Sequence, residues 1–560
     1  MKLIRFLLTY TRENRQSRGI LALIVITGAV SGISNALLLA LISSVLTNLA
    51  RPTSALIWGF VGMCLLLPTS RFISESLLTR LTANTVSNLR MQLSRRILFA
   101  PLKRLEELGT HRLLATLTDD IPSITGALIA IPVLCINIAV VIASLIYMAW
   151  LSPLVLLILL TFMAIGVLSY QLPVLKALGY IKHSREHANA LFKHFRALTE
   201  GIKELKLHSA RREAFLTDEL LNTVTSLKQN SIKGDTIYSA ANSWGQVLIF
   251  VLIGLILFVL PSIKHTLPQT LTGYTLVLLY IMTPLQIILN MLPNLGRANI
   301  AVEKVNELGM LLSASQPDGS HVRPAPANPS WDSLQLIDVT HTYYNEAGTQ
   351  SFMLGPINLT FYPAELVFLV GGNGSGKTTF AKLLTGLYEP EGGRIQLDFQ
   401  PITDERLESY RQNFAVVFSD FFVFERLLGL YNPEIEPKIR EYLTQLQLDE
   451  KVHIENGVLS TTNLSRGQRK RLALLTAYLE DRPFYVFDEW AADQDPLFKE
   501  VFYLHLLPGL KARGKAVLAI THDDKYYQLA DRIIKLDYGK IESEKRLTPA
   551  EKESKASMLI

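Results

Sequence analysis

The sequence has only two cysteines, Cys64 and Cys135, among its 560 residues. Both lie inside long apolar runs, where a cysteine usually serves as a small packing residue. Two isolated cysteines cannot build the disulfide framework of a small secreted protein or a zinc site with several thiolate ligands. The sequence therefore excludes a disulfide scaffold and indicates no cysteine-ligated metal.

Charged residues are also scarce, at 19% of the chain, whereas 49% of the residues are hydrophobic. This composition is too apolar for an ordinary soluble protein and indicates membrane spans. The chain is also too long to favour a single domain. The net charge of +6 is modest, and basic residues alternate with acidic ones, as in Arg211-Arg212-Glu213. This pattern is typical of solvated helices, and we expect no nucleic-acid partner.

Six apolar stretches are long enough to cross a bilayer, near residues 20–46, 56–74, 124–148, 153–173, 244–260 and 272–293. The first is longer than the apolar part of a signal peptide, and no small-residue cleavage site follows it. We therefore expect it to be the first span. Membrane lipids are then one partner of this chain.

The segments between the spans differ in length and charge. The short segments after the first, third and fifth spans carry only Arg51 and Lys264 as basic residues, whereas the segments after the second and fourth are long and basic. By the positive-inside rule the long segments and the N-terminus are cytoplasmic. Six spans return the second half of the chain to the same side, where ATP is available.

Polar side chains within the spans either line a polar cavity or hydrogen-bond between helices, and the sequence leaves both readings open. They are Ser31, Ser34, Asn35, Asn137, Gln246, Tyr280, Gln286 and Asn290. Arg71 and Glu75 are spaced to pair on one helix face. Their pairing at the inner membrane interface and a buried contact with a transported substrate are the two alternatives.

One short stretch in the second half carries the clearest chemistry. Residues 371–378 read Gly-Gly-Asn-Gly-Ser-Gly-Lys-Thr, a phosphate-binding loop of the form G-x-x-x-x-G-K-[ST]. The loop follows an apolar strand-like run at 366–370 and precedes a helical stretch at 379–387, which is the context the motif requires. We expect ATP to be bound by Gly371, Gly372, Asn373, Gly374, Ser375, Gly376, Lys377, Thr378 and Thr379. Lys377 would reach the β- and γ-phosphates, and Thr378 would offer its hydroxyl to Mg²⁺.

The polar, proline-rich stretch 313–330 predicts a linker. Beyond it, strand-like runs at 334–339, 366–370, 414–418, 484–487 and 516–520 alternate with helical stretches, which is typical of an α/β domain. We therefore expect an α-helical transmembrane domain at 1–312, with six spans and long cytoplasmic helical extensions. An α/β phosphate-loop nucleotide-binding domain follows at 331–546, and a polar tail at 547–560.

Three further residues extend the nucleotide site. The apolar strand 484–488 ends in Asp488, which would hold Mg²⁺ through water. Glu489 follows, where its carboxylate could orient or deprotonate an attacking water. His522 follows the strand 516–520, where its imidazole could contact the γ-phosphate. Each motif is weak alone, but their order after a phosphate-binding loop is a strong signal.

With these motifs, residues 334–540 resemble the nucleotide-binding domain of an ATP-binding cassette (ABC) transporter. Residues 464–468, Leu-Ser-Arg-Gly-Gln, resemble the signature sequence LSGGQ, with Arg466 in place of the first glycine. The resemblance implies a head-to-tail pair of cassettes in which Ser465, Gly467 and Gln468 contact the ATP of the other subunit. It also implies that Tyr343 stacks on adenine. One cassette with six spans implies a homodimer of half-transporters, with coupling helices at the tips 109–118 and 201–207.

A narrower resemblance covers nearly the whole chain. Residues 355–360, 371–377 and 488–496 are similar to the cyclic-peptide and siderophore exporter group, which includes the exporter of the lasso peptide microcin J25 and exporters of pyoverdine or syringomycin type. This resemblance implies ATP-driven export of a peptide-like product across a bacterial inner membrane. The alternatives are an exporter of a lipid, a drug or another small amphipathic cargo, and an ATP-regulated membrane protein that does not pump.

Two motifs depart from the general family. Ser419-Asp420 stands where the family has a glutamine that bridges Mg²⁺ to the membrane domain, and we hypothesise that one of these two residues acts through a water. Residues 492–495 read Ala-Asp-Gln-Asp in place of the usual Ser-Ala-Leu-Asp. These departures bear on coupling more than on ATP binding.

Overall fold

The computed structural model describes residues 15–47, 54–263, 268–313, 331–344 and 350–548. The chain divides into two compact units. The first comprises Met1–Leu98 and Thr110–Leu311, and the second comprises Phe99–Gly109 and Leu312–Ile560. The expected linker, apart from Ser313, and most of the expected polar tail lie outside the described residues.

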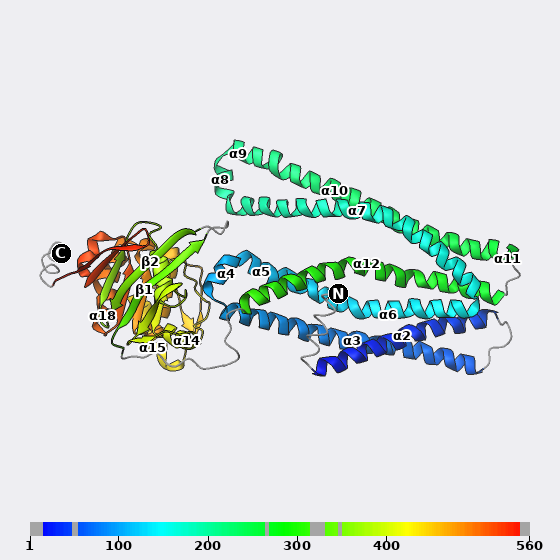
Figure 1. Ribbon diagram of the computed structural model, residues 1–560, viewed down its shortest axis with the longest axis horizontal. Coiled ribbons are helices and arrows are strands. Elements are labelled where there is room, and N and C mark those ends of the chain that lie inside the picture. Colours follow the sequence, from blue (N-terminus) through cyan, green and yellow to red (C-terminus); the bar gives the residue numbers. More distant parts are fainter. Residues whose placement is uncertain (1–14, 48–53, 264–267, 314–330, 345–349, 549–560) are drawn as a thin grey trace. The chain divides into compact units, whose positions relative to one another are not determined.

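The first unit is entirely helical in its described residues (Figure 1). Its long helices are α2 (Arg15–Thr47), α3 (Ser54–Phe99), α6 (Ile121–Leu151), α7 (Pro153–Glu200), α10 (Leu221–Gly254) and α12 (Pro268–Ser313). Shorter pieces are α5 (Thr110–Ala115), η1 (Thr116–Asp120), α8 (Ile202–Leu207), α9 (Ser209–Ala214), η2 (Phe215–Leu220), η3 (Leu255–Val259) and α11 (Leu260–Ile263). Six helical stretches are long and apolar enough to cross a membrane, as the sequence predicted. Because a span needs only about 20 residues, helices of 46 and 48 residues extend well beyond a bilayer.

Small residues let these helices approach one another closely. A Cβ added to Gly32 of α2 would lie 2.8 Å from the Cβ of Ala139 in α6. A Cβ on Gly234 of α10 would lie 3.0 Å from Ile181 Cγ1 in α7. The paired courses of α7 and α10 are visible in Figure 1. Packing through small residues is the usual way for helices to associate in lipid.

Some of the polar side chains of the spans are buried or join two helices, and whether any of them lines a cavity stays open. Ser31, Ser34 and Asn137 are buried, and Tyr238 donates a hydrogen bond to Asn290 Oδ1 at 3.0 Å, joining α10 to α12. Arg71 and Glu75 pair at 2.9 Å, as their spacing predicted, with both side chains more than half exposed.

The second unit is built on a six-stranded sheet of order β12-β11-β3-β10-β9-β6 and a four-stranded sheet of order β2-β1-β4-β5. The first contains β3 (Leu366–Val370), β6 (Phe414–Val417), β9 (Phe484–Asp488), β10 (Ala516–Ile520), β11 (Arg532–Asp537) and β12 (Lys540–Arg546). The second contains β1 (Leu334–Tyr344), β2 (Gln350–Phe361), β4 (Gly392–Leu397) and β5 (Gln400–Pro401). A hairpin joins β7 (Ile454–Glu455) to β8 (Val458–Leu459). All neighbouring strands of the six-stranded sheet pair in parallel, except the antiparallel pair of β11 and β12.

Strands β3, β9 and β10 of the six-stranded sheet are buried on both faces because their side chains alternate between two cores. In β3, Leu366, Phe368 and Val370 face one core, and Val367 and Leu369 face the other. The helices of this unit are α13 (Lys377–Leu384), α14 (Asp404–Arg411), η4 (Pro433–Ile435), α15 (Glu436–Gln445), α16 (Arg466–Glu480), η5 (Trp490–Asp493), α17 (Pro496–Glu500), η6 (Val501–Leu506), α18 (Leu507–Ala512) and η7 (Asp524–Leu529). The sequence predicted β3 and β10 to the residue.

One segment from the first half of the chain belongs to this second unit. Helix α4 (Leu102–Leu108) lies within Phe99–Gly109, and Leu102 packs against the core that contains Val367 and Leu369. From the sequence we expected the tip of this segment, a candidate coupling helix, at residues 109–118, which was wrong. Thr110–Asp120 instead form α5 and η1 and cluster with the long helices, because the residues that fit the second unit lie on α4.

Candidate functional site

The phosphate-binding loop joins β3 to α13, as its motif predicted. Three of its four glycines are required by geometry, and a Cβ on the first of them, Gly371, would lie 2.2 Å from the carbonyl oxygen of Leu536. Gly374 and Gly376 have φ angles of 76° and 100°, which residues with a side chain rarely adopt. The loop therefore presents backbone N–H groups at the start of α13, where an anion is favoured.

Lys377, the first residue of α13, folds back over this loop. Its Nζ donates hydrogen bonds to the carbonyl oxygens of Gly371 at 3.0 Å and Gly372 at 2.9 Å. Only 5% of the side chain is exposed. Burial lowers the pKa of Lys377, and the nearby carboxylates of Glu489 and Asp488 oppose that shift. The ammonium is held ready for an anion that enters the loop.

Asp488, the last residue of β9, is completely buried. Its Oδ2 accepts hydrogen bonds from Thr378 Oγ1 at 3.0 Å and Ser419 Oγ at 3.2 Å. Its Oδ1 has no hydrogen-bond partner within the described residues. Burial raises the pKa of Asp488, and the hydrogen bond from Thr378 opposes that rise.

A buried carboxylate with one unused oxygen beside a threonine hydroxyl fits a hard divalent cation. Asp488 and Thr378 would hold Mg²⁺, as their motifs predicted. The hydroxyl of Ser419 reaches Asp488 directly. In the structure, therefore, Ser419 contacts the predicted metal ligand itself. The water-mediated role of Ser419 or Asp420 stays a prediction.

Glu489 is the third acidic or basic residue of the predicted nucleotide site. It follows β9 with a left-handed φ of 48°, and its backbone is fixed by bonds from its N–H to Ile520 O and from Lys470 Nζ to its carbonyl oxygen. Its Oε1 lies 3.2 Å from His522 Nε2 and 3.9 Å from Lys377 Nζ. The structure thus brings together the three predicted catalytic residues. His522 contacts Glu489 in the structure, and its predicted contact with the γ-phosphate stays a prediction.

The signature residues form the start of α16. Ser465 Oγ accepts a bond from the N–H of Gln468 at 3.3 Å, and Gln468 Oε1 accepts one from the N–H of Ser465 at 3.1 Å, which is a capping box. A Cβ on Gly467 would lie 2.7 Å from the carbonyl oxygen of Asp493. Within the described residues, these capping bonds tie Ser465 and Gln468 to each other and not to the phosphate-binding loop of the same chain.

Tyr343, the predicted adenine-stacking residue, lies near the end of β1 and beside α13. Its hydroxyl accepts a bond from Thr379 Oγ1 at 3.3 Å and donates to the hydroxyl of Tyr388 at 3.2 Å. The sequence analysis did not single out Tyr388, since a tyrosine after a helix carries no motif of its own.

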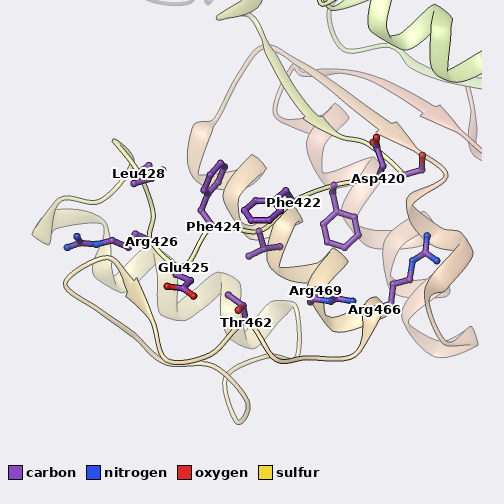
Figure 2. Close-up of a pocket in the computed structure, with 12 residues that line it drawn as sticks. Asp420, Phe422, Phe424, Glu425, Arg426, Leu428, Thr462, Arg466 and Arg469 are labelled. Atoms are coloured by element: carbon purple, nitrogen blue, oxygen red, sulfur yellow. The ribbon is translucent and has the colours of Figure 1, made fainter. Parts of the chain in front are cut away.

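A groove of about 670 Å³ lies beside Ser419 and Asp420 and was not predicted. Figure 2 shows the rings of Phe422 and Phe424 on one side of it and Arg466 and Arg469 on another. Phe422 is 77% exposed and Phe424 is 59% exposed. The aromatic run after Asp420 was the available signal. The groove connects the segment that replaces the family's glutamine to the signature helix.

Comparison with known proteins agrees with this geometry. Residues 354–492 match the ABC transporter family, and residues 19–285 match the ABC transporter transmembrane region. The chain belongs to the ABC transporter family. As a half-transporter of the exporter type, it is a multi-pass membrane protein with an ATPase domain coupled to transport.

The chain is similar to two kinds of ABC protein. ATP-binding protein SyrD of Pseudomonas syringae pv. syringae is 37% identical over 93% of this chain and 93% of that protein. The ATP-dependent lipid A-core flippase of Bordetella pertussis is 27% identical over 86% of this chain and 78% of that protein. The flippase of Haemophilus influenzae is 26% identical, with coverage of 86% and 83%.

Proposed function

We propose that this transporter is a homodimer that exports a peptide-like natural product across the bacterial inner membrane, with its N-terminus and cassette in the cytoplasm. The cargo would be a cyclic peptide, a lasso peptide or a peptide siderophore. The chain is 37% identical to SyrD over 93% of its length but only 26–27% identical to the flippases. This difference supports a cargo other than that of the flippases. The segments 355–360 and 488–496, which resemble the peptide exporter group, support the cargo class.

The contacts of Glu489 with Lys377 and His522, and of Asp488 with Thr378, carry the catalytic part of the proposal. Backbone N–H groups of residues 371–376 and the Lys377 ammonium bind the phosphates of ATP. Thr378 and Asp488 would hold Mg²⁺, which would supply positive charge against the phosphates. Glu489 accepts the proton of the attacking water, and His522 orients the Glu489 carboxylate.

The second copy supplies the other side of each ATP. Ser465 and Gly467 lie at the N-terminus of α16, a helix of 15 residues, where backbone N–H groups favour an anion. Closure of two cassettes around two ATP molecules would drive the spans towards the outward-facing state, and hydrolysis would reset them.

A lipid or drug cargo is the second candidate, because two of the relatives are named as lipid A-core flippases. This candidate makes predictions that differ from those of a peptide exporter.

ATPase activity of the purified protein in lipid nanodiscs separates these candidates. Turnover is measured with and without cyclic peptides, lasso peptides, siderophores, lipids and drugs. Stimulation by peptides, lost in Glu489→Gln, and uphill peptide uptake into inverted vesicles are expected. Stimulation by lipids or drugs alone would reassign the cargo. Steady turnover without any stimulation or uptake would contradict both cargo assignments.

A further inference from the structure

Helix α4 is fastened to the cassette by charged side chains at two points. Glu106 Oε1 lies 2.7 Å from Lys382 Nζ on α13, and Glu106 Oε2 accepts a hydrogen bond from the hydroxyl of Tyr388. Lys103 Nζ lies 2.7 Å from Glu391 Oε1. Because hydrogen bonds to ionised groups are stronger than those between neutral groups, α4 is held firmly on this surface.

The residues that bind α4 at these two points are hydrogen-bonded in turn to residues nearer the phosphate-binding loop. Tyr388 accepts a hydrogen bond from the hydroxyl of Tyr343, and Tyr343 accepts one from the hydroxyl of Thr379. Thr379 directly follows the loop residue Thr378. Glu391 Oε2 accepts the backbone N–H of Thr342, the neighbour of Tyr343, at 3.1 Å. Two routes therefore run from α4 to β1, and one of them reaches the first turn of α13.

The longer route is a chain of three O–H donors that all point the same way, from Thr379 to Tyr343 to Tyr388 to the Glu106 carboxylate. In such a chain each bond polarises the next. Burial, and then the hydrogen bond to Glu106, raise the pKa of Tyr388, so its hydroxyl stays protonated and remains a donor.

The rings on this route are locked in place. Tyr388 is 2% exposed, and the buried ring of His341 stacks on it with centroids 4.9 Å apart. His341 also meets Tyr343 edge to face at 5.4 Å. Because close-packed rings cannot move independently, a displacement of Tyr343 is passed to Tyr388.

We propose that Tyr388 and Glu106 are positioning residues that transmit occupancy of the nucleotide site to α4 through Tyr343 and Thr379. The inference rests on the proposed function in one respect, that ATP binds against the loop and Tyr343. Since α4 lies in the chain between α3 and α5, a shift of α4 acts on the long helices at both of its ends. This route starts from Tyr343 and the first turn of α13. It does not include Ser419, which stands at the family's glutamine position and bonds to Asp488.

The test uses the full-length protein in nanodiscs and the non-hydrolysable ATP analogue AMP-PNP with Mg²⁺. Hydrogen exchange of the amides of residues 102–108 is measured with and without the analogue, and the analogue's Kd is measured separately. Tyr388→Phe removes the hydroxyl and keeps the ring. Tyr410→Phe is the matched control, because Tyr410 is also buried and its hydroxyl bonds to the carbonyl oxygen of Leu384, away from α4.

We expect the analogue to slow exchange in α4 in the wild type and in Tyr410→Phe. In Tyr388→Phe the Kd should stay within about twofold, while the response of α4 to the analogue falls by at least about fivefold. Glu106→Gln should cause the same loss of the α4 response to the analogue. Because the Glu106 side chain is 40% exposed, this variant tests the inference even if Tyr388→Phe does not fold.

An unchanged analogue response of α4 in both variants would overturn the inference, even if exchange without nucleotide were faster, since that would show only a structural role. Tight analogue binding by the wild type without any response of α4 would also overturn it. Failure of the wild type to bind the analogue would instead contradict the proposed ATP site.

Discussion

Arg466 Nε lies 3.2 Å from Asp493 Oδ2. Arg466 departs from the family's signature, and Asp493 is one of the residues that depart from its Ser-Ala-Leu-Asp segment, so the two departing segments are in contact. Asp493 also bonds to Lys470 Nζ at 2.7 Å, and the Lys470 side chain is only 1% exposed. This hydrogen bond from Lys470, followed by the charges of Lys470 and Arg466, lowers the pKa of Asp493. The two departures are therefore joined through one carboxylate.

We expect Asp493→Ala to destabilise the protein by about 3 kcal/mol, because the buried Lys470 ammonium loses its counter-charge. Arg466→Gly should cost less than about 1 kcal/mol, since that side chain is 64% exposed and solvent screens its pair. Thermal unfolding of both variants in nanodiscs measures the difference. Equal melting temperatures would contradict the assignment of Asp493 as the partner of Lys470.

The same carboxylate gives a pH dependence with a definite sign. Because the folded-state pKa of Asp493 is lowered, its contribution to stability is fully present above the ordinary aspartate pKa of about 4 and is lost as pH falls through the lower folded value. Asp493→Asn should therefore flatten the acid limb of the melting-temperature profile. A profile identical to that of the wild type would contradict this sign.

Glu489→Gln should lower the ATP hydrolysis rate by about 10²–10⁴-fold, because the amide cannot accept the proton of the attacking water. ATP binding should persist, since the phosphate-binding loop and Asp488 are untouched, and the closed dimer should accumulate. Turnover, retained nucleotide and dimer closure are measured together. Glu500→Gln, which alters an exposed ion pair with Lys525, is the matched control. Normal turnover in Glu489→Gln would remove Glu489 from its proposed role.

Lys377→Ala should abolish hydrolysis, because the Lys377 ammonium is placed directly over the loop carbonyls of Gly371 and Gly372. We expect weak ATP binding in this variant, measured by nucleotide titration of the protein in nanodiscs. Removal of Mg²⁺ with a chelator should likewise stop turnover in the wild type. Normal hydrolysis by Lys377→Ala would count against the whole nucleotide-site assignment.

Ser419→Ala removes one of the two side-chain donors to Asp488 Oδ2 and leaves Thr378 in place. Loss of one hydrogen bond to Asp488 should raise the Mg²⁺ concentration that gives half-maximal turnover by about threefold to tenfold. Asp420→Ala, one residue along the same groove, is the comparison and should change that concentration less. If neither variant alters cargo-stimulated ATPase activity, neither residue takes over the role of the family's glutamine.

The sequence by itself determined the six spans, the phosphate-binding loop and strands β3 and β10. Spans follow from local hydropathy, and the loop follows from a contiguous motif whose glycines are required by backbone geometry. These features need only neighbouring residues, so they can be read without the fold.

Only the tertiary structure decided which distant residues meet. Glu106 and Tyr388 are 282 positions apart, and Ser419 and Asp488 are 69 apart. The position of the coupling segment on α4 likewise depends on Leu102 packing against the cassette core. Side-chain contacts of this kind depend on how strands and helices assemble into layers, and no local pattern in the chain records that assembly.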